Sequence, residues 1–118
     1  MPFDGAEVSE VTELLVIGRA RIEAGWCQKK DRCNKWSMRG YHVHYCLIGS
    51  ILYDLPRIGL ARAEELLKDA IERLGYSHKC LVTFNDAWGR TQDQVIEVCD
   101  VAIAISRGEY RPLERRNP

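Results

Sequence analysis

The sequence predicts a mainly α-helical protein, a single compact domain of about four helices with a long loop between the first and the second. Apolar residues recur at three- and four-residue steps over several stretches, and glycine or proline follows these stretches. A chain of 118 residues, 46% of them hydrophobic and 29% charged, suits one core. We expect a domain over residues 1–108 and a flexible tail over 109–118.

The first predicted helix begins at Asp4, which forms a capping box with Glu7. Gly25 is expected to end this helix. Its core-facing residues repeat at helical spacing; they are Val8, Val11, Leu15, Gly18 and Ile22. Residues 26–41 have no usable period and are rich in charged side chains, which predicts a long ordered loop or a loop with one short turn. Loops of this length are often functional.

Two further helices are predicted in the middle of the chain. One runs from about Val43 to Leu55 and is apolar nearly all round, so it is expected to be central and buried. Pro56 stops it, because proline pushes the preceding residue out of the helical region. The other covers about residues 60–74, with Gly75 as its natural end.

The last third of the sequence holds one ambiguous segment and one clear helix. Residues 79–84 are the only strand-like run, but so short a run fits an extended segment or a short helix equally well. Thr91 and Gln94 form a capping box, and apolar residues then follow at helical spacing as far as Gly108.

Charge and cysteine content set the expected environment. The 17 basic and 17 acidic residues cancel, so no global field favours nucleic acid or membrane, although local patches still can. No apolar stretch approaches the roughly 20 residues of a spanning helix, and the N-terminus is acidic where a secretory signal would be basic. We therefore expect a bacterial or phage-host cytoplasmic protein whose five cysteines are reduced thiols.

Three local motifs occur in a familiar order. They are Gly25-Trp26-Cys27-Gln28, Tyr45-Cys46-Leu47-Ile48-Gly49 and Phe84-Asn85-Asp86-Ala87-Trp88-Gly89-Arg90-Thr91. Together they resemble an uncharacterised family of short bacterial and phage proteins, over roughly residues 10–106. The chain departs from that family with Phe84 where tryptophan is usual and with a more basic 29–44 segment. The resemblance implies a helical domain of unknown function and brings no activity with it.

One interpretation of the loop is a zinc site. Cys27, Cys33, His44 and Cys46 are the right ligand types and lie within twenty residues. Their spacing matches none of the recurring zinc patterns, so the alternative is that Cys46 is a core thiol and the others are ordinary loop residues. No cofactor is expected, and a bound zinc ion is the alternative.

A cysteine-dependent enzyme is a further alternative. Cys27 follows Trp26, and later histidines with Asn85 or Asp86 supply the residue types of a nucleophile, a base and an orienting group. Cys27 would sit at a helix C-terminus, however, whose negative dipole end raises the pKa of a thiol. No catalytic residues are assigned, and an enzyme is the less favoured class.

The favoured hypothesis is a non-catalytic binding protein. Two charged, tryptophan-bearing loops, residues 26–44 and 85–91, each abut a helix end and are expected to meet. Exposed tryptophan and arginine are typical binding anchors, and basic residues beside aromatics also suit phosphates and bases. The predicted partner-binding residues are Trp36, Arg39, Asn85, Asp86, Trp88 and Arg90. For residues 85–91 taken alone, a self-bonded structural loop is favoured over a recognition loop whose Arg90 and helix N-terminus bind an anion. The partner is a protein or a nucleic acid, and homo-oligomers are left open.

Overall fold

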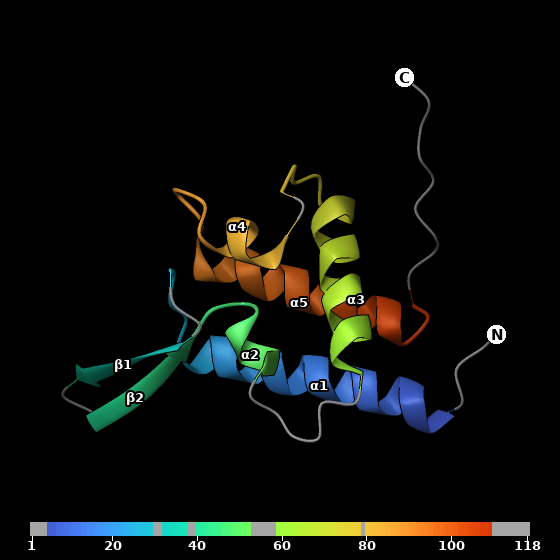
Figure 1. Cartoon of the computed structure of the whole chain (residues 1–118), viewed down its shortest axis with the longest axis horizontal. Helices are drawn as coiled ribbons and strands as arrows, with labels where there is room; N and C mark the ends of the chain where they lie inside the picture. Colours follow the sequence, from blue (N-terminus) through green and yellow to red (C-terminus); the bar gives the residue numbers. More distant parts are fainter. Residues whose placement is uncertain (1–4, 30–31, 38–39, 53–58, 79, 110–118) are drawn as a thin grey trace.

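The structure is a computed structural model that describes residues 5–29, 32–37, 40–52, 59–78 and 80–109 (Figure 1). Of residues 5–9, 32–37, 40–42 and 52 it describes the backbone only. Five helices and one hairpin make up the described part; they are α1 (Gly5–Ala24), β1 (Arg32–Ser37), β2 (Gly40–Tyr45), α2 (Gly49–Leu52), α3 (Leu60–Arg73), α4 (Leu81–Asn85) and α5 (Gln92–Ser106). The prediction of a mainly helical fold is confirmed.

The helices pack around one core in two directions. Helices α1 and α5 lie along each other, and α3 crosses both of them (Figure 1). The helices turn apolar side chains inward, and the largest fully buried apolar side chains belong to Phe84, Leu15, Ile22, Leu47, Ile51, Leu67, Ile71, Leu81, Val95 and Val98. Burying each such side chain contributes roughly 1.5–3 kcal/mol, so this cluster is the main source of stability.

Gly18 lets α2 approach the middle of α1. A Cβ atom at this position would lie 2.9 Å from Cγ2 of Ile51 and 3.0 Å from Oγ of Ser50. A contact as short as the one with Ile51 requires a shift in the packing of α2 against α1. A glycine inside a helix costs about 1 kcal/mol relative to alanine, and here the close packing of α2 is the compensation.

The segment predicted as an irregular loop contains a hairpin instead. Strands β1 and β2 pair antiparallel, with Arg32 opposite Tyr45 and Ser37 opposite Gly40. Two residues therefore connect the strands, but they are Met38 and Arg39 rather than the Asn-Gly type that marks such turns in a sequence. The hairpin extends away from the helices at the C-terminal end of α1 (Figure 1).

The helix predicted over 43–55 is wrong over its first part. Residues 43–45 belong to β2, and α2 covers only Gly49–Leu52; residues 53–55 lie outside the described part. Periodicity does not separate a strand from a buried helix in a short apolar run, and β-branched and aromatic residues such as Val43 and Tyr45 favour the strand. The proposed N-cap Asp4 also lies outside the described residues.

The helices with clear end signals appear where the sequence placed them. Helix α3 ends before Gly75, which has a left-handed φ of +87°. Residues 81–85 take the short-helix alternative as α4. Thr91 caps α5 through a complete capping box, because its hydroxyl accepts from the Gln94 amide while the Gln94 side chain accepts from the Thr91 amide. These are local signals, which is why they could be read from the sequence.

The Thr91 cap gives a direct stability test. Thr91→Ala removes the acceptor for the Gln94 amide, and we expect a loss of about 1 kcal/mol in the free energy of unfolding, measured by urea denaturation. Thr91→Ser keeps the hydroxyl and should stay near the wild-type value. Equal stability of the alanine and serine variants would contradict a contribution from the capping box.

Candidate functional site

The buried side-chain amide of Asn85 joins three segments of the chain. Asn85 ends α4 and is 0% exposed. Its Oδ1 accepts from Nε1 of Trp26 at 2.7 Å and from the amide of Leu47 at 3.0 Å. Its Nδ2 donates to the Cys27 carbonyl at 3.1 Å and to Oδ1 of Asp86 at 3.0 Å. All four hydrogen-bonding positions of the amide are therefore occupied.

A second set of bonds extends this junction toward the surface. Nε2 of Gln28 donates to the carbonyl of Asn85 at 2.9 Å and to that of Ala87 at 3.1 Å. The amide of Lys29 donates to Oδ1 of Asp86 at 2.8 Å, and Lys29 has a left-handed φ of 68°. The structure thus brings the start of the 26–44 segment against the 85–91 loop, as the sequence predicted.

Arg90 is held against the body of the protein. Its Nε donates to the Phe84 carbonyl at 2.8 Å, and its Cζ lies 3.9 Å from the centre of the Phe84 ring and 4.6 Å from that of Tyr76. Its Nη1 donates to Oε1 of Gln94 at 3.4 Å. These contacts fit the structural account of the loop, since the guanidinium stacks on aromatic rings and closes the turn.

Trp88 is the exception within this loop, because its side chain is fully exposed. The turn around it is fixed, since the Ala87 amide donates to Phe84 and the Arg90 amide donates to Ala87. Gly89 supplies the left-handed φ of +79° that the turn requires. Val82 of α4 is also half exposed. The indole is therefore exposed on a loop whose Asp86 and Arg90 side chains are bonded to the rest of the protein.

The two remaining predicted binding residues belong to the hairpin. Trp36 lies on β1 opposite Tyr41 of β2. Arg39 is outside the described residues, and the side chain of Trp36 is not described. The base of the hairpin is tied to the body, because the Cys27 amide donates to the Tyr45 carbonyl and the Tyr45 amide donates to the Gly25 carbonyl. The hairpin and the Trp88 loop therefore start from the same junction.

The four predicted zinc ligands have the following surroundings. Cys27 is buried with its Sγ 3.5 Å from the His44 carbonyl, and Cys46 is buried with its Sγ accepting from the Gly49 amide. Nδ1 of His44 lies 3.2 Å from the Trp26 carbonyl. Cys33 is opposite His44 in the hairpin, but its side chain is not described. Within the described residues, no three His, Cys, Asp or Glu side chains are placed to hold a metal ion.

Two thiols outside the predicted site differ in their acidity. Burial raises the pKa of Cys99 on α5 to about 12. The pKa of the exposed Cys80, which precedes α4, is lowered chiefly by its hydrogen bond with the Thr83 side chain. Sequence reasoning missed this contrast, because the signal depends on which cysteine the fold exposes.

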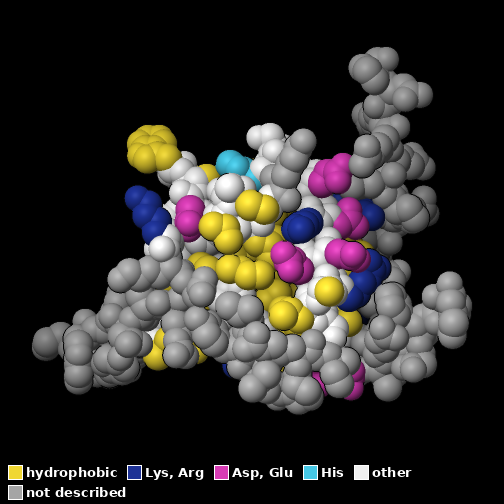
Figure 2. Space-filling view, viewed as in Figure 1, with side chains coloured by type: hydrophobic (Ala, Val, Ile, Leu, Met, Phe, Trp, Pro, Cys, Tyr) yellow, Lys and Arg dark blue, Asp and Glu magenta, His cyan; other side chains and the backbone are white. Residues whose placement is uncertain are grey.

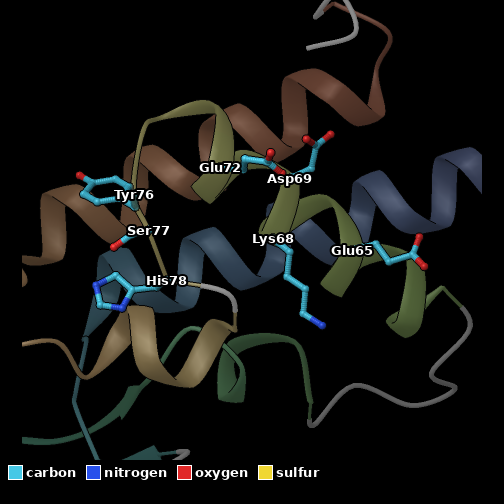
Figure 3. Close-up of a pocket in the computed structure, with 7 residues that line it drawn as sticks. All are labelled: Glu65, Lys68, Asp69, Glu72, Tyr76, Ser77 and His78. Atoms are coloured by element: carbon cyan, nitrogen blue, oxygen red, sulfur yellow. The ribbon is translucent and has the colours of Figure 1, made fainter. Parts of the chain in front are cut away.

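A hollow of about 690 Å³ lies beside α3 and was also not predicted. It is lined by Glu65, Lys68, Asp69, Glu72, Tyr76, Ser77 and His78. In Figure 3 these side chains point in different directions rather than converging. Asp69 pairs with Arg73 at 3.3 Å, and Lys68 approaches Glu64 at 3.8 Å. Its charges are thus largely paired within α3, which is typical of a helix surface.

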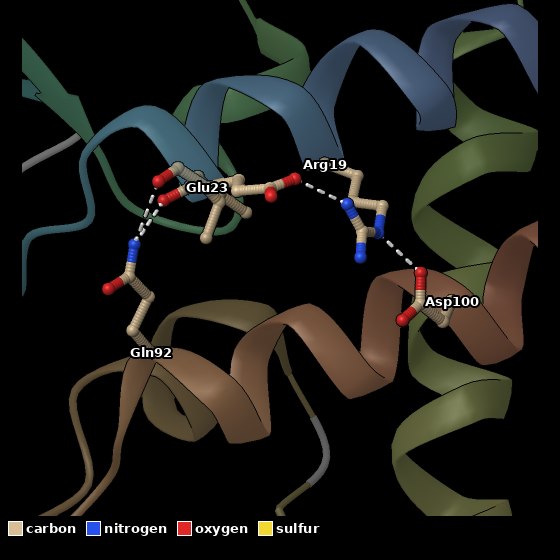
Figure 4. A network of polar contacts seen from close by, with 5 residues as sticks. Arg19, Glu23, Gln92 and Asp100 are labelled. Carbon is tan, nitrogen blue, oxygen red and sulfur yellow. Dashed lines mark hydrogen bonds and ion pairs between the residues drawn. The ribbon is translucent and has the colours of Figure 1, made fainter.

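A third polar cluster fastens α1 to α5 (Figure 4). Arg19 of α1 bonds Asp100 of α5 and its own neighbour Glu23. Nε2 of Gln92 donates to the Ile22 carbonyl at 2.6 Å and to the Glu23 carbonyl at 3.3 Å. Gln92 therefore satisfies carbonyls in the last turn of α1, where no helical partner remains. This cluster stabilises the fold and presents no open site.

Fold and site together define a small helical domain with a projecting hairpin, whose three sequence motifs meet at one buried amide. The chain belongs to a family of unknown function, DUF6197, whose profile matches residues 6–105. No curated protein and no solved structure gave a match. Of the helices in the described ranges, none combines the length and the apolar character needed to cross a bilayer.

The Asn85 junction makes a specific prediction. Asn85→Asp preserves the shape but replaces the Nδ2 donor by an oxygen facing the Asp86 carboxylate. We expect a loss on the order of 3–5 kcal/mol at neutral pH, because the buried charge is uncompensated. Burial and the neighbouring charge raise the pKa of the new carboxyl, so the folded state binds more protons and stability should recover as pH falls toward about 5.

The measurement is urea denaturation across that pH range. Gln28→Glu is the matched control, since it makes the same amide-to-acid change at a half-buried position in the same junction, and a smaller loss is expected. If Asn85→Asp has the free energy of unfolding of the wild type and shows no pH dependence, the Asn85 amide does not hold the three segments together.

The zinc hypothesis is tested separately. We expect protein purified without chelator to lack stoichiometric zinc and to melt identically with EDTA, because Cys27, His44 and Cys46 each contact other groups of the chain. Elemental analysis and thermal melting are the measurements. Near-stoichiometric zinc that is lost in Cys33→Ser, with a lower melting temperature in EDTA, would instead establish a structural metal site.

Proposed function

We propose that this protein is a non-catalytic binding protein that engages another macromolecule through the Trp88 loop, residues 86–90, and the adjoining β1–β2 hairpin. The observation that carries the proposal is the fully exposed indole of Trp88 on a loop that is otherwise bonded inward. Tryptophan is among the residues that most often dominate binding energy at interfaces.

The fixed geometry of the loop supports a binding role. An exposed side chain on a mobile loop loses conformational freedom when a partner binds, and this loss weakens affinity. Around Trp88 the loop conformation is already set by the bonds of Asp86, Ala87 and Arg90. Only the indole itself needs to be ordered on binding, so more of its contact energy is available for affinity.

Trp88→Ala tests the proposal. We expect the purified full chain to capture a macromolecule from an extract of its native host, and the alanine variant to bind it at least about 30-fold more weakly, as for an interface residue contributing 2 kcal/mol or more. Stability should change by less than about 0.5 kcal/mol, because the side chain makes no buried contact.

Val16→Ala is the matched control, since Val16 is an exposed apolar residue of α1 outside the proposed surface. It should retain full capture. If Trp88→Ala and wild type retain the same material with equal affinity, Trp88 is not a binding residue and the proposal fails. Treating the captured material with nuclease or protease identifies its class.

A further inference from the structure

The basic residues of the chain are concentrated in and around the hairpin. Residues 26–45 hold five of the 17 basic residues and one of the 17 acidic residues, a net charge of +4. The rest of the chain carries twelve basic and sixteen acidic residues and is net negative. On the face shown in Figure 2, the basic and acidic side chains over α3 lie side by side. The chain as a whole is therefore neutral, whereas the segment that contains the hairpin is positively charged.

This segment carries both basic and aromatic residues. Lys29 is exposed at the turn that leads into the hairpin, and Arg32 and Lys35 follow on β1. Trp36 is next in the strand and lies opposite Tyr41. The hairpin is a two-stranded ribbon that projects from the helices (Figure 1).

The loop that carries the exposed indole is hydrogen-bonded to the turn that leads into this hairpin. The Lys29 amide donates to Oδ1 of Asp86 at 2.8 Å, two residues before Trp88. The same Oδ1 also accepts from Nδ2 of Asn85. The one acidic side chain of the loop is thus engaged by two donors of the junction. Trp88 and Lys29 therefore belong to one continuous surface.

We propose that the macromolecule bound by this surface is a single-stranded nucleic acid; this inference rests on the proposed function. The positive charge of residues 26–45 attracts the phosphates, and Trp88 stacks on a base. Basic grooves with exposed aromatic side chains are the general means of binding single strands without sequence preference. A duplex offers few free base faces, so stacking on Trp88 selects the single strand.

The charge argues against a protein partner for the same surface. The buried centres of protein interfaces are depleted of lysine, because desolvating a compact ammonium group is costly. Phosphates along a nucleic-acid strand instead gain affinity from each basic contact through the release of condensed counterions. A segment of net charge +4 next to an exposed indole is suited to the second kind of partner.

The test is fluorescence anisotropy of labelled oligothymidylate and oligouridylate of about 20 nucleotides, with a duplex of similar length, using the full chain. Neutralisation of about three phosphates by this segment predicts a slope of log K against log salt of about −2, which is about a 20-fold loss of affinity between roughly 50 and 200 mM salt. Trp88→Ala should weaken binding about 5- to 150-fold. The two single strands show whether DNA, RNA or both are bound.

Charge variants separate specific contacts from total charge. Lys35→Gln should lower the salt slope by about 0.7, and Lys68→Gln on α3, which makes the same charge change outside the surface, should leave it unchanged. Absence of saturable binding to either strand at low salt overturns the inference. An affinity that Trp88→Ala leaves unchanged overturns it as well. Captured protein that resists nuclease and is lost in Trp88→Ala would overturn this inference while keeping the proposed function.

Discussion

The side-chain amide of Asn85 is the constraint on which the arrangement of the described loops depends. It connects the segment after α1, the segment before α2 and the end of α4 by three hydrogen bonds, and a fourth goes to the adjacent Asp86. A buried polar group left without a partner costs about 1–3 kcal/mol, so the three segments must be in place together. The three motifs that carry the family resemblance each contribute a residue to this junction.

The hairpin and the Trp88 loop both take their position from that junction. Tyr45 bonds to Gly25 and Cys27 on one side, and Lys29 bonds to Asp86 on the other. Gly25 leaves space for the His44 ring, since a Cβ atom there would lie 2.8 Å from it. A rigid helical body thus holds the base of a projecting ribbon next to one exposed indole.

The sequence predicted those parts of the fold that depend on near neighbours. The capping box of Thr91 and Gln94 and the end of α3 at Gly75 involve residues a few positions apart, and both were correct. The hairpin was missed because its stability comes from pairing between strands, and its connecting residues carry no turn signal. The contact between the two loops was expected, but Asn85 finds its partners in the other two segments 38 to 59 residues away, beyond any local pattern.

The 84–91 motif therefore contains residues with two different kinds of role. Asn85, Asp86 and Arg90 are engaged with the body of the protein, so their presence is explained by the fold. Trp88 makes no buried contact, so the fold does not explain it. Because the inward residues fix the backbone on both sides of Trp88, a change at Trp88 alters the surface and leaves the junction intact. A change of the exposed surface can consequently be separated from a change in stability within one motif of eight residues.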